Sequence, residues 1–142
     1  MYRHILIPTD GSELAKHGIA QGMALAKSIG AKVSVIFAVE PFSELTGHFR
    51  DTIANYAEMR KEQATKALND AANAAREAGI PCGTVLAENG QPHQAIIAAA
   101  ADRGCDLIVM SSHGRSGLSV LLIGSVTNKV LAQAKTPVLV CP

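Results

Sequence analysis

A loop rich in small residues, residues 111–125, contains the groups in this chain most able to bind a charged ligand. It follows the apolar run Leu107–Met110 and precedes an amphipathic segment at Val126–Ala134, so it leads from a buried strand into a helix. The helix start is marked by Gly124 and Ser125. Backbone N–H groups at a helix N-terminus, beside a glycine that admits close approach, favour phosphate.

Gly124 and Ser125 also have a simpler interpretation, in which the glycine ends a turn and the serine caps the next helix. Gly114 and Gly117 in the same loop favour phosphate binding, because a loop of small residues can fold its amides into an anion-binding concavity. Arg115 either adds charge-assisted hydrogen bonds to a phosphate or is a solvated surface arginine. Both interpretations stay open at this point.

Asp10 is the second candidate, since it follows the apolar run Ile5–Pro8 in the segment Thr9-Asp10-Gly11-Ser12. An aspartate before glycine often bonds its own backbone in a turn. Alternatively, its carboxylate accepts hydrogen bonds from sugar hydroxyls or from a base amine. The residue types alone do not decide between these roles.

Other chemistries are disfavoured by spacing. His113 lies beside Ser112, but adjacent residues seldom present a nucleophile and its base to each other, and neither serine lies in a G-x-S-x-G elbow. The chain contains neither G-x-G-x-x-G nor G-x-x-x-x-G-K-[ST], and the remaining histidines have no metal-ligand spacing. The three cysteines are odd in number and far apart, which predicts reduced thiols in a cytoplasm: Cys82, Cys105 and Cys141.

The elements that must position these residues alternate between strands and helices. Apolar runs predict five strands, at Ile5–Pro8, Val33–Val39, Thr84–Ala87, Leu107–Met110 and Val138–Val140. Helical patterns predict four helices, from Ser12 to Ile29, from Asp51 to Ala78, from about Gly90 to Arg103, and the final one at Val126–Ala134. Such an alternation predicts an open, doubly wound α/β fold, a parallel sheet with helices on both faces. Ligands of these sheets bind beyond the carboxyl ends of the strands, where the strand order reverses.

The size and charge of the chain limit the number of domains and the classes of partner that we expect. With 142 residues we expect one domain over residues 1–142. The net charge of +1 gives no electrostatic footprint for nucleic acid or an anionic membrane. No apolar run reaches the roughly 20 residues of a membrane span. Because a strand begins almost at Met1, we expect a cytoplasmic protein without a signal peptide.

The terminal segment Pro137–Pro142 is apolar and uncharged. If Val138–Val140 forms a sheet edge, its open backbone groups favour pairing with a second copy, and we expect a homodimer. The alternative is a solvated edge that Pro142 protects from pairing.

These residues resemble the universal stress protein family over essentially the whole chain. Residues 5–12 resemble the opening strand and loop of that family, and residues 112–140 resemble its closing signature. Its ATP-binding members have the pattern G-x2-G-x9-G-[ST]. In this chain the last three positions of the pattern fall on Gly114, Gly124 and Ser125, while the first falls on Ser111, a departure.

The resemblance implies a three-layer, adenine nucleotide α-hydrolase-like fold with strand order 3-2-1-4-5. It implies that ATP is bound, with magnesium or manganese carried by the phosphates rather than held by a protein metal site. The residues that the resemblance assigns to ATP fall into four groups: Gly114, Gly124, Ser125 and the Val126 amide at the phosphates; Pro8, Thr9 and Asp10 at the nucleoside; the Val39 backbone at the adenine; and Met110 and Ser111 as the floor. Arg115 is added to this set for its charge and its place in the loop. Members of the family are commonly homodimers joined through the last strand.

The resulting hypothesis is a cytoplasmic, dimeric stress-response regulator that binds ATP and turns it over slowly or not at all. No evident general base or water-positioning residue accompanies the proposed phosphates. Two alternatives stay open. One is a family member that binds no nucleotide and acts as an interaction module, which Ser111 favours. The other is a slow ATPase or an autophosphorylating protein.

Overall fold

The computed structural model describes residues 1–39, 50–88, 90–113 and 123–142, and the predicted loop at residues 40–49 lies outside them. Strands and helices alternate throughout: β1 His4–Thr9, α1 Glu13–Ile29, β2 Lys32–Ala38, α2 Arg50–Ala78, β3 Cys82–Ala87, α3 Pro92–Asp102, β4 Leu107–Ser111, α4 Ser125–Gln133 and β5 Val138–Cys141. The third strand begins two residues before its predicted start, because Cys82 and Gly83 continue its pairing with β2.

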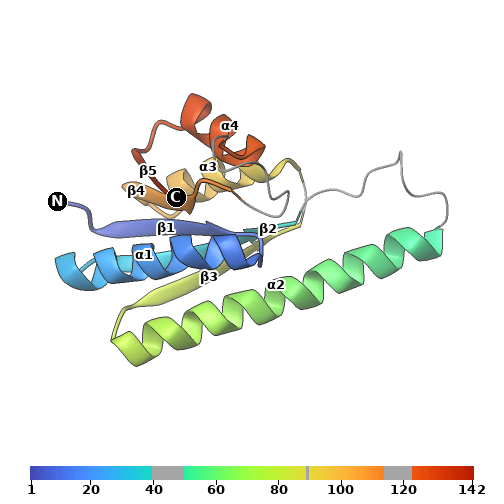
Figure 1. Ribbon diagram of the computed structural model, residues 1–142, viewed down its shortest axis with the longest axis horizontal. Helices are drawn as coiled ribbons and strands as arrows, with labels where there is room; N and C mark the ends of the chain where they lie inside the picture. Colours follow the sequence, from blue (N-terminus) through green and yellow to red (C-terminus); the bar gives the residue numbers. More distant parts are fainter. Residues whose placement is uncertain (40–49, 89, 114–122) are drawn as a thin grey trace.

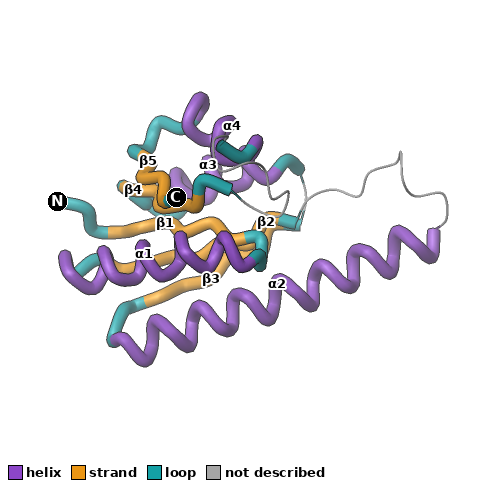
Figure 2. The backbone as a smooth tube through the Cα atoms, viewed as in Figure 1, coloured by secondary structure: helices purple, strands orange, loops and turns teal. Residues whose placement is uncertain are grey.

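The five strands form one parallel sheet in the order β3-β2-β1-β4-β5. Helices α1 and α2 cover one face, and α3 and α4 cover the other (Figure 1). Figure 2 shows the strands as a single layer between the two helical layers. The predicted three-layer fold and strand order are confirmed.

Both faces of the central strands are buried, which explains their almost continuous apolar sequence. All six residues of β1 are buried. On the α1–α2 face, Ile5 and Ile7 join Val35 and Phe37 in one core cluster. Leu6, one residue out of phase with them, packs into the cluster on the α3–α4 face.

The ends of α1 agree with the sequence. The Ser12 hydroxyl accepts a hydrogen bond from the Ala15 amide at 3.1 Å, and Gly30 closes the helix in the left-handed conformation at φ 72°. The start of α4 differs from the simpler interpretation given above. Ser125 is already helical, and the N-cap position belongs to Gly124, with no side-chain cap hydrogen bond.

Within the part of the chain that the structure describes, no helix has both the length and the apolar character needed to cross a membrane.

Candidate functional site

The sheet separates between two of its central strands. β1 pairs with β2 at six positions, from His4 to Thr9. With β4 it pairs at only two, Ile5 with Leu107 and Leu6 with Ile108. Beyond Leu6 the two strands therefore diverge, and this is also where the strand order reverses.

Pro8 accounts for this separation in part. The His4 carbonyl accepts a hydrogen bond from the Asp106 amide, so the backbone of His4 faces β4. Neighbouring residues of a strand face opposite sides, so the backbone of Pro8 faces β4 as well. Proline has no N–H to donate to that ladder. Pro8 therefore cannot donate a hydrogen bond that would extend the pairing of β1 with β4 beyond Leu6.

A cavity of about 460 Å³ opens where the strands diverge. Eight of the eleven predicted site residues line it: Pro8, Thr9, Asp10, Met110, Ser111, Gly124, Ser125 and Val126. The two segments on which the prediction depended, the loop after β1 and the start of α4, thus meet at one cavity although they are far apart in sequence.

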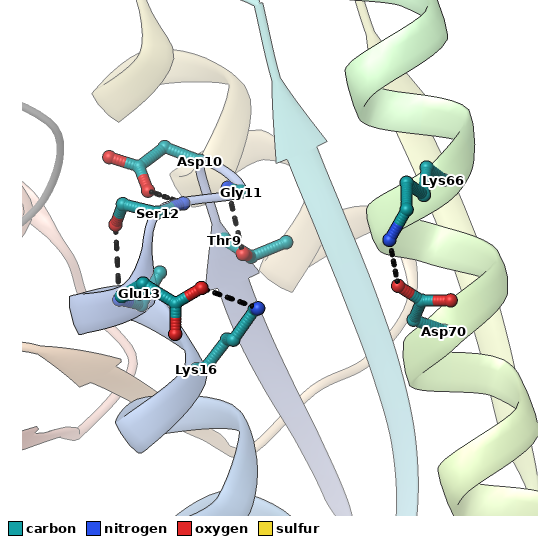
Figure 3. A network of polar contacts seen from close by, with 9 residues as sticks. Thr9, Asp10, Gly11, Ser12, Glu13, Lys16, Lys66 and Asp70 are labelled. Carbon is teal, nitrogen blue, oxygen red and sulfur yellow. Dashed lines mark hydrogen bonds and ion pairs between the residues drawn. The ribbon is translucent and has the colours of Figure 1, made fainter.

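The loop after β1 is held by its own side chains (Figure 3). The Asp10 carboxylate accepts a hydrogen bond from the Ser12 amide at 2.9 Å, and the Thr9 hydroxyl accepts one from the Gly11 amide at 3.1 Å. Gly11 takes a positive φ of 80°, which a residue with a side chain seldom adopts. Asp10 therefore has the turn role and also lines the cavity, so the two roles proposed from the sequence are compatible.

The start of α4 is fixed to the end of β4. The Gly124 amide donates to the Ser112 carbonyl at 2.7 Å, and the Thr127 hydroxyl donates to the Ser111 carbonyl at 2.9 Å. The amides of the first helical residues have no acceptor within their own helix. The positive end of the helix dipole thus lies at the cavity, at Ser125 and Val126. The Gly124 amide, by contrast, is already used.

Val39 is the one described residue of the predicted site that does not line the cavity. Val39 is half-buried beside it, and its amide donates to the Ala87 carbonyl at 2.8 Å. The Val39 amide is therefore already used in pairing with the end of β3. Gly114 and Arg115 lie outside the described residues.

The cavity also contains residues that the sequence analysis did not select. Tyr56 and Arg60, one turn apart on α2, form one wall, while Pro92 and Ile96 of α3 form another. The sequence contains a signal that Arg60 faces the core. Arg60 lies four residues before Ala64, so it extends the buried apolar stripe of α2 by one turn. That stripe consists of Ala64, Leu68, Ala71 and Ala75.

His113 is a further lining residue, and its Nδ1 lies 2.8 Å from the Ser112 hydroxyl. Among the described residues no three His, Cys, Asp or Glu side chains are placed to share a metal ion. The three cysteines are free thiols, and burial raises the pKa of each: Cys82, Cys105 and Cys141. The arrangement is a cavity with helix-terminal amides on one side and hydroxyl, carboxylate and guanidinium groups on the other.

Comparison with known proteins assigns this chain to a family. The model of the universal stress protein family matches residues 1–142. The universal stress protein YxiE of Bacillus subtilis is 36% identical over 150 aligned positions, which cover 99% of each chain. This chain belongs to the universal stress protein family.

Solved structures of universal stress proteins share the fold. The structure of MJ0577 from Methanocaldococcus jannaschii superposes with a TM-score of 0.84 at 28% identity, covering 99% of this chain and 95% of that one. An Archaeoglobus fulgidus universal stress protein in complex with dAMP has a TM-score of 0.65 at 22% identity, covering 98% and 97%. A universal stress protein in complex with cAMP has a TM-score of 0.63 at 22% identity, and the alignment covers 99% of this chain and 96% of that one.

Ser111, the departure from the ATP-binding pattern of the family, has its hydroxyl directed at α1. Its Oγ donates to the Leu14 carbonyl at 2.8 Å and accepts from the Gly18 amide at 3.1 Å. These two backbone groups are partners in a regular α-helix, so the hydroxyl bridges them. Gly18 leaves the room that this requires, since a Cβ there would lie 2.7 Å from the Ser111 Oγ. The hydroxyl therefore joins α1 to β4.

Proposed function

We propose that this universal stress protein binds ATP in the cavity between β1 and β4 and acts as a nucleotide-dependent regulator with little or no turnover. The start of α4 carries the proposal. Gly124 caps the helix without a side-chain hydrogen bond, and the first residues of α4 line the cavity. A helix N-terminus in this position favours an anionic group such as a triphosphate.

The ligand has its phosphates at the amides of Ser125 and Val126. The nucleoside lies beside Pro8, Thr9 and Asp10, and the base approaches the Val39 backbone. Met110 and Ser111 form the floor, and the family pattern adds Gly114 at the phosphates, and Arg115, the next residue, is added for its positive charge. Magnesium or manganese accompanies the phosphates, because Mg²⁺ commonly keeps several waters and binds through substrate phosphates.

Two observations support an adenine nucleotide. The cavity volume of about 460 Å³ lies within the usual range for small-molecule sites. Universal stress proteins of the same fold are known in complex with dAMP and with cAMP. The adenine base is common to those ligands and to ATP.

The experiment compares two variants at one backbone position. Ser125→Pro deletes a single amide donor, and proline is well accepted as the first residue of a helix. Gly124 has φ −59° and ψ 153°, a conformation that a residue before proline adopts readily. Ser125→Ala is the matched control, since it removes the hydroxyl and keeps the amide.

Titration calorimetry with ATP and magnesium then tests the proposal. Because a hydrogen bond to a charged group contributes about 1.5–3 kcal/mol, Ser125→Pro should bind ATP about tenfold or more weakly than the wild type. Ser125→Ala should stay within about threefold of the wild type. Equal affinity of the wild type and Ser125→Pro would place the phosphates elsewhere. A wild type without saturable binding below about millimolar, or about −4 kcal/mol, would favour the interaction module instead.

A second candidate function is slow hydrolysis or autophosphorylation. The observation in its favour is that His113, hydrogen-bonded to Ser112, lines the same cavity. Incubation with ATP and magnesium, followed by a nucleotide assay and intact-protein mass spectrometry, decides the matter. Release of ADP over many turnovers would show that the protein is an ATPase, and a phosphoadduct would show that it phosphorylates itself. Either result would overturn the proposal of a regulator with little or no turnover.

We further propose a cytoplasmic homodimer joined through β5, without nucleic acid or membrane as partners. β5 is an edge strand of the sheet, and 45% of the Leu139 surface is exposed. Pairing with a second β5 would satisfy the outward-facing backbone groups of this edge. The net charge of +1 is the argument against polyanionic partners.

A further inference from the structure

Arg60 is a charged residue in an unusually buried position. Its side chain, on α2, is only 2% exposed. The guanidinium carbon lies 5.1 Å from the centroid of the Phe37 ring, and Nη1 donates to the Gln63 side-chain oxygen. The aromatic face and the amide hold the guanidinium group in place from two sides.

Arg60 also contributes to the lining of two cavities. Arg60 lines the site cavity together with Tyr56, and it lines a second cavity of about 630 Å³ between α1 and α2. A guanidinium group has five N–H donors in one plane and no acceptor, so it complements ligand groups that only accept.

The fold determines which part of the nucleotide Arg60 can meet. α2 and α4 lie on opposite faces of the sheet (Figure 1). Phosphates at the start of α4 would therefore be remote from α2. Phe37, whose ring contacts the Arg60 guanidinium group, pairs with Thr9 at the ends of β2 and β1. The residue after Phe37, Ala38, lines the cavity. Arg60 thus belongs to the nucleoside end of the site.

We propose that Arg60 determines base specificity, and that its guanidinium group donates a hydrogen bond to a ring nitrogen of the purine. The inference rests on the proposed function, because it assumes a purine nucleotide in this cavity. A purine ring presents acceptor nitrogens that a donor-only group can recognise. Arg60 then connects the bound base to α2.

The test uses Arg60→Met, which keeps the length of the side chain and removes its donors. Arg76→Met is the matched control: Arg76 lies on the same helix and bonds Asn73 across three residues, as Arg60 bonds Gln63, but it is exposed. Each protein is titrated with ATP, with tripolyphosphate, and with ATP analogues in which ring nitrogen 1, 3 or 7 is replaced by carbon.

We expect Arg60→Met to bind ATP about tenfold more weakly than the wild type, with tripolyphosphate binding unchanged. One deaza analogue should show the same loss on the wild type, and Arg60→Met should not distinguish that analogue from ATP. A purely structural role would not produce this match between one ring nitrogen and one side chain. Arg76→Met should behave as the wild type.

The contrary outcomes are distinguishable. A wild type that binds ATP, and binds all three deaza analogues equally well, refutes the role of Arg60 and leaves the proposed function standing. This readout also decides the question if Arg60→Met fails to fold. A wild type that binds no ATP refutes both proposals together.

Discussion

Ser111 gives a quantitative test of how the site is built. Its hydroxyl makes two hydrogen bonds to the backbone of α1, at 2.8 Å to Leu14 and 3.1 Å to Gly18. In Ser111→Ala these two backbone groups can pair with each other, because they are separated by one helical turn. The net loss should then be about 1 kcal/mol of unfolding free energy, the usual contribution of one hydrogen bond.

Ser111→Gly restores the glycine of the family pattern and should lose more. Glycine within a strand costs about 0.5–1 kcal/mol relative to alanine, so the total destabilisation is about 2 kcal/mol. For a domain of this size that corresponds to a decrease of about 6 °C in Tm. ATP affinity should stay within about twofold, because the hydroxyl is bonded to α1.

Urea unfolding followed by circular dichroism measures the stabilities, and calorimetry measures ATP binding. Ser28→Ala is the control: the exposed Ser28 hydroxyl also donates to a helical carbonyl, that of Leu25, and its loss should change stability by less than about 0.5 kcal/mol. Tenfold tighter ATP binding by Ser111→Gly, with unchanged stability, would mean that the Ser111 side chain faces the ligand, and the reasoning would be refuted.

Two further predictions concern the opposite end of the sheet and its edge. Burial, followed by the nearby Lys32 charge, lowers the pKa of His4, so the unfolded chain takes up a proton at a higher pH than the folded protein. The free energy of unfolding should therefore fall as pH drops below 6.5, by at most about 1.4 kcal/mol per pH unit. In urea titrations at several pH values, His4→Gln should lack this slope, whereas the control His17→Gln should keep it. Equal slopes in the wild type and both variants would contradict the prediction. At the edge, the carbonyls of Pro137 and Cys141 accept from β4, so the backbone of Val140 faces outward. If the proposed homodimer forms through β5, Val140→Pro should weaken it at least tenfold in sedimentation experiments while the monomer stays folded, and an unchanged dimer would exclude pairing through β5.

The sequence predicted elements well where local signals are strong. Ser12 and Gly30 mark the two ends of α1 because capping and the left-handed conformation each require particular residue types. Residue type alone does not fix the start of α4, because glycine and serine are both acceptable N-caps and the choice between Gly124 and Ser125 depends on the preceding turn.

The side chains that form the walls of the site could not be predicted from local sequence patterns. The direction of the Ser111 side chain depends on β4 extending one residue beyond its apolar run, which places Ser111 on the α1 face. Arg60 lies in a strongly charged part of α2, and its burial results from the packing of α2 across the sheet onto Phe37. The apolar stripe of α2 indicates that Arg60 faces the core, but the partner that it meets there, Phe37, has no signature in either segment alone.

The central claim is that ATP lies where β1 and β4 separate, with its phosphates at the start of α4. A nuclear magnetic resonance titration of nitrogen-15-labelled protein with ATP and magnesium tests it most directly. The amide signals of Ser125, Val126 and Thr127 should shift together with that of Thr9, while that of Cys82, at the far end of the sheet, stays in place. Saturable binding that leaves the Ser125 and Val126 signals unmoved would contradict the account.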